Sequence, residues 1–317
     1  MVPGFLFRAH YNPAMRGLLH LLVTVSTLGL VLPACAQTAD LERHLRNQYQ
    51  GKTFLLRGFY SDDHLHYDSV GAVIGTSTPG DWTANGFVQV DGIRVSDQRL
   101  TITAKRLVAF SLGRTFQLRV DELKTDEKKV MPLLLEIQAD LGQKDPSGKQ
   151  SDVAMATIFL TAQDNFASLV PDYWKPCVPA GLLGRDPNCN FSPEILAIPG
   201  VTPSETATEA TSGGLSYPSL STVFEVGKGV SPPTVITQVD PEFSANARRA
   251  KFQGSMTLLL VINREGLPTN IHISSPLGGG LDAKAVHATQ SWRFKPAEKD
   301  GQPVAVEIAL EVDFHLF

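Results

Sequence analysis

Two histidines in one short segment have the arrangement in this sequence that is most typical of a metal-binding site. They lie in Asp62-Asp-His-Leu-His-Tyr-Asp68, where a β-strand would put His64 and His66 on one face with acidic residues nearby. Imidazole and carboxylate groups together can bind a transition metal. The same pattern is more typical of a solvated strand face or a hairpin tip. We therefore assign no metal and no cofactor from the sequence.

The cysteines bear on the cellular compartment. Cys177 and Cys189 flank a loop that contains proline and glycine and can pair with each other, which leaves Cys35 single. In the chain-entropy account, a disulfide closing so short a loop stabilises the fold by roughly 3 kcal/mol, and it needs an oxidising compartment such as a periplasm. Zinc is the alternative for two thiols, although no nearby histidine completes a ligand set.

Other residue patterns argue against an enzyme. The sequence has no evident nucleophile-base pair, phosphate-binding glycine loop or paired-carboxylate motif. Trp82, Tyr173 and Trp174 could form a surface on which a ligand stacks, but large aromatic side chains more often complete a core or its rim. The formal net charge of -4, with 19% charged residues, leaves no basic excess for a nucleic-acid partner. The sequence predicts a non-enzymatic protein.

The clearest structural pattern lies in residues 235–317. Every second residue from Val304 to Leu316 is apolar, which predicts a long strand with one buried face. Shorter strands are predicted over 254–263 and 270–274, and helices over 241–250 and 281–292. This order predicts an α+β domain in which helices cover one face of an antiparallel three-stranded sheet.

These residues resemble the C-terminal domain of the TonB family of energy transducers. The resemblance covers about a quarter of the chain and departs from the family pattern at Phe243-Ser244, where Tyr-Pro is the commoner pair. It rests on segments in family order and at family spacing, namely Asp240-Pro-Glu-Phe-Ser-Ala-Asn-Ala-Arg248, Gly254, Gly266, Leu281-Asp282, Trp292-Arg-Phe-Lys-Pro-Ala297 and Gly301-Gln-Pro-Val304.

The resemblance implies binding of an extended partner peptide, such as a segment of an outer-membrane receptor, in transport across the outer membrane. The peptide would add a strand to an exposed sheet edge. An inner-membrane motor complex is a further implied partner. A passive periplasmic scaffolding or cell-wall-associated protein, without energy coupling, is the alternative function. The residues expected to contact the partner are Asp240, Pro241, Phe243, Arg248, Ala305, Glu307, Ala309 and Glu311.

Conspicuous side chains of the same domain are expected to be structural. Trp292 and Phe294 should lie in the core. Pro296, Gly301 and Pro303 should shape the approach to the last strand. None of these residues has an arrangement typical of catalysis.

Residues 1–36 have the pattern of an export signal. Met15-Arg16 supplies a start-like methionine and a positive charge, residues 18–32 are nearly all apolar, and Ala34-Cys-Ala36 fits a cleavage site. An uncleaved membrane segment is one alternative, but about fifteen residues span only roughly 23 Å of a hydrocarbon core of about 30 Å. A lipoprotein signal with acylated Cys35 is the other. The expected location is the periplasm of a Gram-negative-type bacterium, with or without an anchor.

The remaining chain divides into two parts. Residues 37–192, which include the Cys177–Cys189 loop, contain strand-like runs such as 115–120 and 153–160, and predict a β-rich sandwich or open barrel. Residues 193–233 are rich in Pro, Ser, Thr and Gly and predict a linker. Such a linker would let the domain of residues 234–317 move away from the first domain.

Overall fold

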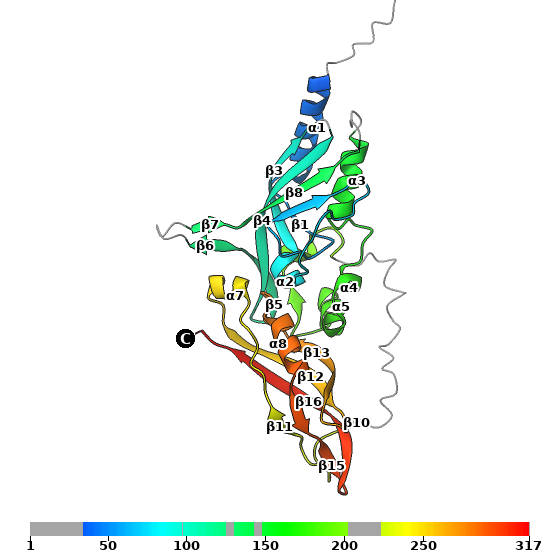
Figure 1. The fold of residues 1–317 in the computed structure, drawn as a ribbon, viewed down its shortest axis with the longest axis vertical. Helices are drawn as coiled ribbons and strands as arrows, with labels where there is room; N and C mark the ends of the chain where they lie inside the picture. Colours follow the sequence, from blue (N-terminus) through cyan, green and yellow to red (C-terminus); the bar gives the residue numbers. More distant parts are fainter. Residues whose placement is uncertain (1–33, 97, 125–129, 143–147, 202–222, 317) are drawn as a thin grey trace, which may run out of the picture.

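The computed structural model describes residues 34–96, 98–124, 130–142, 148–201 and 223–316. They form an elongated molecule in which an N-terminal domain sits above a C-terminal domain (Figure 1). None of the helices within these ranges is long and apolar enough to cross a membrane. The predicted signal lies mostly in residues 1–33, outside the described ranges, and the side chain of Cys35 is also outside them.

A seven-stranded sheet forms the centre of the N-terminal domain. Its longest strand, β4, pairs with β3 on one side and with both β5 and β8 on the other. Alternate residues in the first half of β4 are buried, as expected for a strand with one face in a core. The strands are β1 (Thr53–Leu55), β2 (His64–Tyr67), β3 (Phe87–Val95), β4 (Arg99–Leu112), β5 (Thr115–Val120), β8 (Leu134–Asp140) and β9 (Asn190–Phe191).

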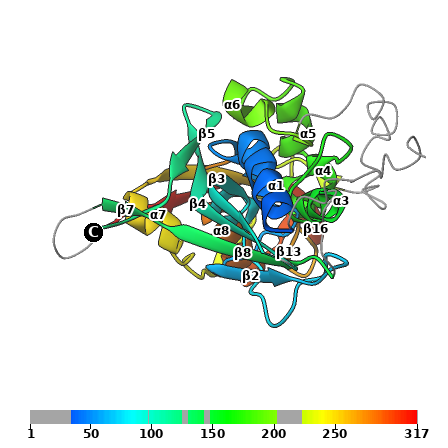
Figure 2. The same cartoon turned by 90° about the horizontal axis from the view of Figure 1, so that it is seen from above.

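Helices, rather than a second large sheet, accompany this sheet. The apolar core of its upper half joins Leu45 of α1 to Met155 and Ile158 of α3, and Figure 2 shows these two helices near each other. The prediction of a sandwich or open barrel is therefore not confirmed. The helices are α1 (Ala34–Tyr49), α2 (Trp82–Asn85), α3 (Lys149–Ile158), α4 (Phe166–Leu169), η1 (Asp172–Trp174), α5 (Cys177–Leu182) and α6 (Pro193–Leu196).

The strand predicted over 153–160 is wrong for most of its length, because residues 149–158 form α3. The buried residues Ser151, Met155 and Ile158 recur at spacings of four and three, which is the helical period. The short apolar run around them fits either element. A small separate ribbon, β6 (Glu122–Lys124) with β7 (Val130–Pro132), completes the domain.

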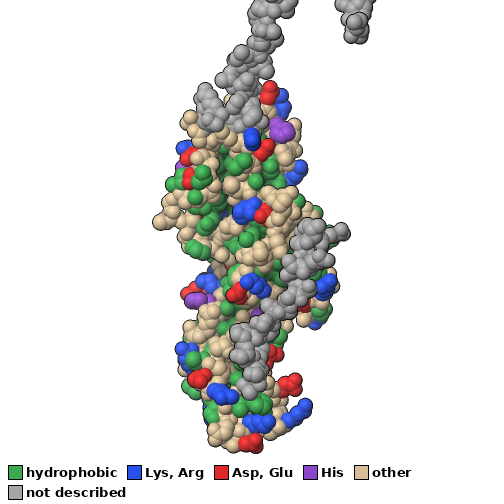
Figure 3. Space-filling model, turned by 90° about the vertical axis from the view of Figure 1, so that its right-hand side faces the viewer, with side chains coloured by type: hydrophobic (Ala, Val, Ile, Leu, Met, Phe, Trp, Pro, Cys, Tyr) green, Lys and Arg blue, Asp and Glu red, His purple; other side chains and the backbone are tan. Residues whose placement is uncertain are grey.

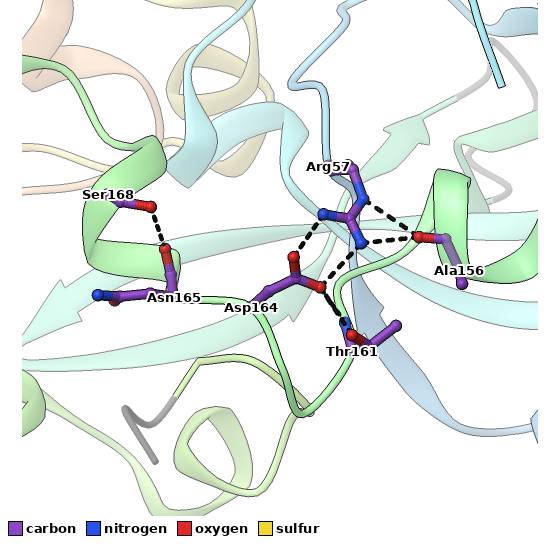
Figure 4. A network of polar contacts seen from close by, with 6 residues as sticks. All are labelled: Arg57, Ala156, Thr161, Asp164, Asn165 and Ser168. Atoms are coloured by element: carbon purple, nitrogen blue, oxygen red, sulfur yellow. Dashed lines mark hydrogen bonds and ion pairs between the residues drawn. The ribbon is translucent and has the colours of Figure 1, made fainter. Parts of the chain in front are cut away.

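A polar network joins the chain after β1 to the chain after α3 (Figure 4). Arg57 donates to both carboxylate oxygens of Asp164, at 2.5 and 2.8 Å, and also to the carbonyl oxygen of Ala156. Burial alone would raise the pKa of Asp164, but the bonds from Arg57 and Thr161 outweigh it and leave the pKa lowered. These bonds pair the polar groups of Arg57, Thr161 and Asp164 with one another, so we assign these side chains a structural role.

The predicted cysteine pair is a disulfide, with an S–S distance of 2.05 Å between Cys177 and Cys189. It links the start of α5 to the residue before β9, and both sulfur-bearing residues are buried. The zinc alternative does not apply to this pair. The bond closes a short loop next to the core that contains Trp82 and Trp174.

The C-terminal domain contains the predicted α+β fold with additional short strands. Its five-stranded sheet has the order β10-β16-β12-β13, with β15 also paired to β16, where three strands were expected. Strands of two or three residues show no periodicity, which is why the sequence did not predict β10 and β15. The strands are β10 (Val223–Phe224), β12 (Gly254–Ile262), β13 (Pro268–Ser275), β15 (Ala297–Lys299) and β16 (Gln302–Phe314).

Two helices, α7 (Ala245–Ala250) and α8 (Leu281–Gln290), and a ribbon of β11 (Thr234–Thr237) with β14 (Arg293–Lys295) complete this domain. Trp292 and Phe294 are buried in its core, as predicted. The indole N–H of Trp292 donates to the carbonyl oxygen of Val239 at 2.9 Å. Trp292 therefore fixes the segment that leads into α7.

The two domains share one apolar core. A single cluster contains Trp82, Phe110 and Trp174 of the first domain together with Leu281 and Trp292 of the second. In this structure the C-terminal domain packs against the first domain, and its movement away from the first domain stays a prediction. Residues 193–201 of the predicted linker carry α6 and buried apolar side chains, and residues 202–222 lie outside the described ranges.

Candidate functional site: a sheet edge and a domain interface

The C-terminal sheet has two outer strands with different surroundings. β13 lies against η1 and α5 of the N-terminal domain. β16 pairs with β12 from Val306 to Phe314 on one side, and on the opposite side β10 pairs only with Ala305 and Val306. Within the described part of the chain, no strand pairs with residues 307–313 on that opposite side.

The alternation of backbone groups shows which residues of β16 face this open side. The N–H of Asn263 donates to the carbonyl oxygen of Leu267 at 3.0 Å across the turn into β13. Because backbone groups alternate along a strand, Val261 also faces β13 and Ile262 faces β16. Ile262 is opposite Val306 in an unbroken register, so even-numbered residues of β16 face β12. The residues whose backbone groups face the open side are Glu307, Ala309, Glu311 and Asp313.

The side chains of these residues are exposed. Asp313 accepts a hydrogen bond from the hydroxyl of Ser255 on β12. The opposite face of β16 carries Val306, Val312 and Phe314, which are buried. The strand therefore has a fixed inner face, while its outer side presents small or acidic side chains and backbone groups that are unpaired among the strands that the structure describes.

The other predicted contact residues have different surroundings. The backbone of Ala305 is already beside β10. Phe243 packs edge-to-face against Phe314, with ring centroids 5.6 Å apart, and so belongs partly to the core. Arg248 is exposed on α7, and Asp240 accepts from Gln238 at 3.1 Å. Pro241 is half-buried ahead of α7.

The interface between the domains contains an ion pair that the sequence did not predict. Asp121, between β5 and β6, is buried and accepts from Arg249 of α7 at 2.9 and 2.5 Å. Asn246 of the same helix donates to Asp121 at 2.8 Å. A buried carboxylate that has lost water is stabilised by such charge-assisted bonds. This contact fixes α7 on the N-terminal domain.

A glycine-rich loop before α8 forms the second half of the interface. The N–H of Gly279 donates to the carbonyl oxygen of Ala109 at 2.8 Å, and the N–H of Ser111 donates to Leu277 at 2.7 Å. The N–H of Gly280 donates to the hydroxyl of Thr83 at 2.8 Å. A side chain at Gly278 would place its Cβ 2.2 Å from the Ala109 carbonyl oxygen. Glycine is therefore required where the two backbones meet.

Two buried carboxyl groups lie beside this loop. Asp282, in the first turn of α8, accepts from the N–H groups of Leu277 and Gly278 at 2.8 and 2.6 Å. Burial raises the pKa of Asp282 to about 7, and the nearby charge of Asp81 adds to this effect. Burial also raises the pKa of Asp81, the N-cap of α2.

In the N-terminal domain the sequence offered two groups that could bind a ligand, the tryptophans and the histidines. Both have structural roles. Trp82 and Trp174 are fully buried with ring centroids 5.0 Å apart, so they belong to the core rather than to a stacking surface. His66 Nε2 lies 3.1 Å from Asp140, and His64 lies beside Asp63. The described residues contain no group of three or more His, Cys, Asp or Glu side chains arranged to hold a metal ion.

The distribution of charge on the surface also bears on the class of partner. In the view of Figure 3, acidic and basic side chains are interspersed over both domains rather than gathered by sign. This distribution agrees with the small net charge of -4. The face in this view has no broad basic patch of the kind that binds nucleic acid.

Residues 239–316 match the family described as Gram-negative bacterial TonB protein C-terminal. The C-terminal domain is of the TonB type. Over 86 residues the chain is 30% identical to Protein TonB of Vibrio cholerae serotype O1, an alignment that covers 27% of this chain and 35% of that protein. The chain thus spans about a third of the length of this curated relative.

A solved structure titled Solution NMR structure of Pseudomonas aeruginosa TonB CTD is also similar. It is 18% identical, with a TM-score of 0.23, and the match covers 28% of this chain and 89% of that one. The family match lies entirely within the TonB-type domain. The open side of β16 and the whole of α7 and α8 fall inside the matched range.

Proposed function

We propose that the TonB-type domain binds an extended peptide of an envelope protein, such as an outer-membrane receptor segment, by strand addition to β16. The observation that carries this proposal is the row of backbone groups from Glu307 to Asp313 that no strand of the described residues pairs with, on a strand whose other side is paired with β12. An unpaired edge of this kind is a template for another strand. The function is binding in transport across the outer membrane, without catalysis.

The pairing of β10 supports the choice of edge. β10 lies parallel to β16, with Val223 opposite Ala305 and Phe224 opposite Val306. This edge therefore accepts a strand from elsewhere in the chain. A partner peptide that pairs with residues 307–313 would extend the sheet beyond the position where β10 ends. The peptide would gain main-chain hydrogen bonds from alternate residues and specificity from its contacts with the exposed side chains.

Ala309 offers a test that leaves the core unchanged. Ala309→Pro removes an N–H that faces the open side, and the side chain it replaces is exposed. The loss of one backbone bond is worth about 0.5 to 1.5 kcal/mol, so peptide binding should weaken by roughly twofold to tenfold, or more where the ring also blocks the strand. Affinity for a peptide identified by crosslinking from position 311 is the measurement.

Ala309→Ser is the matched control, because it changes the same side chain and keeps the N–H group. It should bind as the native chain does. Thermal unfolding checks that both variants remain folded. Equal affinities of a folded Ala309→Pro variant and the native chain would exclude this edge. A crosslinker at Asn270, on the β13 edge, should capture less of the same peptide because η1 and α5 lie against that strand.

A passive envelope-binding protein is the second candidate, and the domain interface favours it. A domain held against its neighbour by Asp121 and the loop of residues 277–280 has less reach than a tethered domain. The two candidates use the same edge and differ in energy coupling. The two candidates can be distinguished by measuring uptake of a receptor substrate in cells that lack this protein. Loss of uptake is expected only if the protein is an energised transducer.

Localisation in the periplasm follows from the same proposal. We expect the mature chain to begin near Gln37, or at acylated Cys35, because Ala34-Cys-Ala36 fits a cleavage site. Mass spectrometry of the protein recovered from fractionated cells measures its N-terminus directly. A full-length chain retained in the inner membrane with residues 15–36 attached would contradict this expectation and favour an energised transducer with an inner-membrane motor.

A further inference from the structure

Two carboxyl groups from different domains are buried at the same interface. Asp282 of the TonB-type domain is fully buried, and Asp81 in the N-terminal domain is half-buried, with one carboxylate oxygen buried beside the indole of Trp174. The charge of Asp81 acts on Asp282 and adds to the effect of burial on the pKa of that carboxyl group. Two acidic side chains at one interface are unusual, because buried acids normally have a cationic partner.

Both carboxyl groups hold the loop of residues 277–280. Asp282 accepts the N–H groups at the start of that loop. At its end, the N–H of Gly280 donates to the hydroxyl of Thr83, which in turn donates to Asp81. The loop therefore carries the hydrogen bonds between domains and is fixed at each end by one of the two acids.

The cations on the surrounding elements have other partners or face outward. Arg249 is bonded to Asp121, and Arg106 of β4 donates to the carbonyl oxygens of Asn85 and Asp62. Tyr173 of η1 faces both acids, and burial raises the pKa of its hydroxyl. The other charged or titratable groups on elements packed here are the Asp172–Lys175 pair of η1, Arg248 of α7, Lys284 with Glu242, His287 of α8 and His272 of β13.

We propose that this interface is a proton-controlled latch, closed while the pair Asp81–Asp282 holds a proton and weakened when both acids are ionised. Two like charges in a buried site cannot both ionise without a large cost. Opening the interface returns both carboxyl groups to water and removes that cost. It would also separate η1 and α5 from β13. The latch stands whether or not β16 binds a peptide.

The direction of the effect follows from the protons bound in each state. A solvent-exposed aspartate has a pKa near 3.9, whereas burial raises the pKa of Asp282 to about 7 in the docked state. Between these values the docked state binds more protons than the open state, so docking weakens as pH rises. Because docking is linked to the binding of one proton, the equilibrium constant for docking changes by up to about tenfold per pH unit. This pH dependence levels off above pH 7.

Hydrogen exchange of the amides that cross the interface measures this latch in the full chain. The N–H groups of Ser111, Gly279 and Gly280 each donate to the opposite domain. Their protection factors, which correct for the intrinsic pH dependence of exchange, should fall by about tenfold per pH unit between pH 5 and 7. Amides of β12 bonded within the C-terminal sheet serve as the internal reference and should change little.

Variants separate the two acids from general pH effects. Asp81→Asn leaves in place both backbone N–H groups that donate to Asp282, and it should flatten the pH dependence at the three amides. Asp282→Asn should do the same if the domain still docks. Asp172→Asn is the control, because its carboxyl is exposed on η1, and it should keep the native slope. Protection that is constant from pH 5 to 8 in the native chain, or a native slope in Asp81→Asn, would overturn the proposal.

Discussion

Trp292→Ala is expected to destabilise the C-terminal domain by about 3 to 5 kcal/mol, the usual cost of deleting a large buried aromatic side chain. Trp292 is 6% exposed and packs beside Phe294, with ring centroids 6.0 Å apart. Its removal leaves a cavity and also leaves the carbonyl of Val239 without its indole donor. The free energy of unfolding, measured by urea titration of the full chain, is the readout.

Trp292→Phe is the matched variant, because it keeps most of the ring volume and removes the N–H. Its cost should be closer to the roughly 1 kcal/mol typical of one hydrogen bond, with a smaller packing term. The difference between the two variants separates volume from hydrogen bonding. A Trp292→Ala chain with native stability that fails to bind a peptide would place Trp292 on the recognition surface instead.

Gly278→Ala is expected to separate the two domains. The added Cβ would lie 2.2 Å from the carbonyl oxygen of Ala109, and Gly278 has φ of +81°, where alanine is strained by about 1 to 2 kcal/mol. Relieving this clash moves the two backbones apart where Gly279 donates to Ala109, and so weakens that bond. Amide exchange at Gly279 and Gly280 should therefore accelerate at least tenfold beyond the effect of the φ strain.

Gly301→Ala isolates that strain, because Gly301 has φ of +77° and no atom within 4 Å of an added Cβ. It should lower the stability of its own hairpin while the interface amides keep their protection. The contrast between the two variants tests the contact with Ala109 rather than glycine loss in general. Native protection at Gly279 in a folded Gly278→Ala chain would mean that the domains are not docked through this loop in solution.

Local patterns predicted much of the TonB-type domain. The alternation from Val304 onward identified β16, helical spacing identified α8, and the burial of Trp292 and Phe294 followed from their positions. The cysteine pair was also predictable, since only two cysteines lie in one loop. Each of these inferences depends on residues near one another in the chain, for which periodicity and spacing are sufficient.

Long-range packing decided the rest. The sequence placed Asp282 in the first turn of a helix, where the dipole favours an ionised carboxylate, but the fold buries it near Asp81 and favours its protonated form. Gly280 meets Thr83 across 197 positions of sequence, and no local pattern encodes that contact. The open side of β16 is likewise a tertiary property, because a strand's own residues define its two faces but not which neighbours pair with its edges.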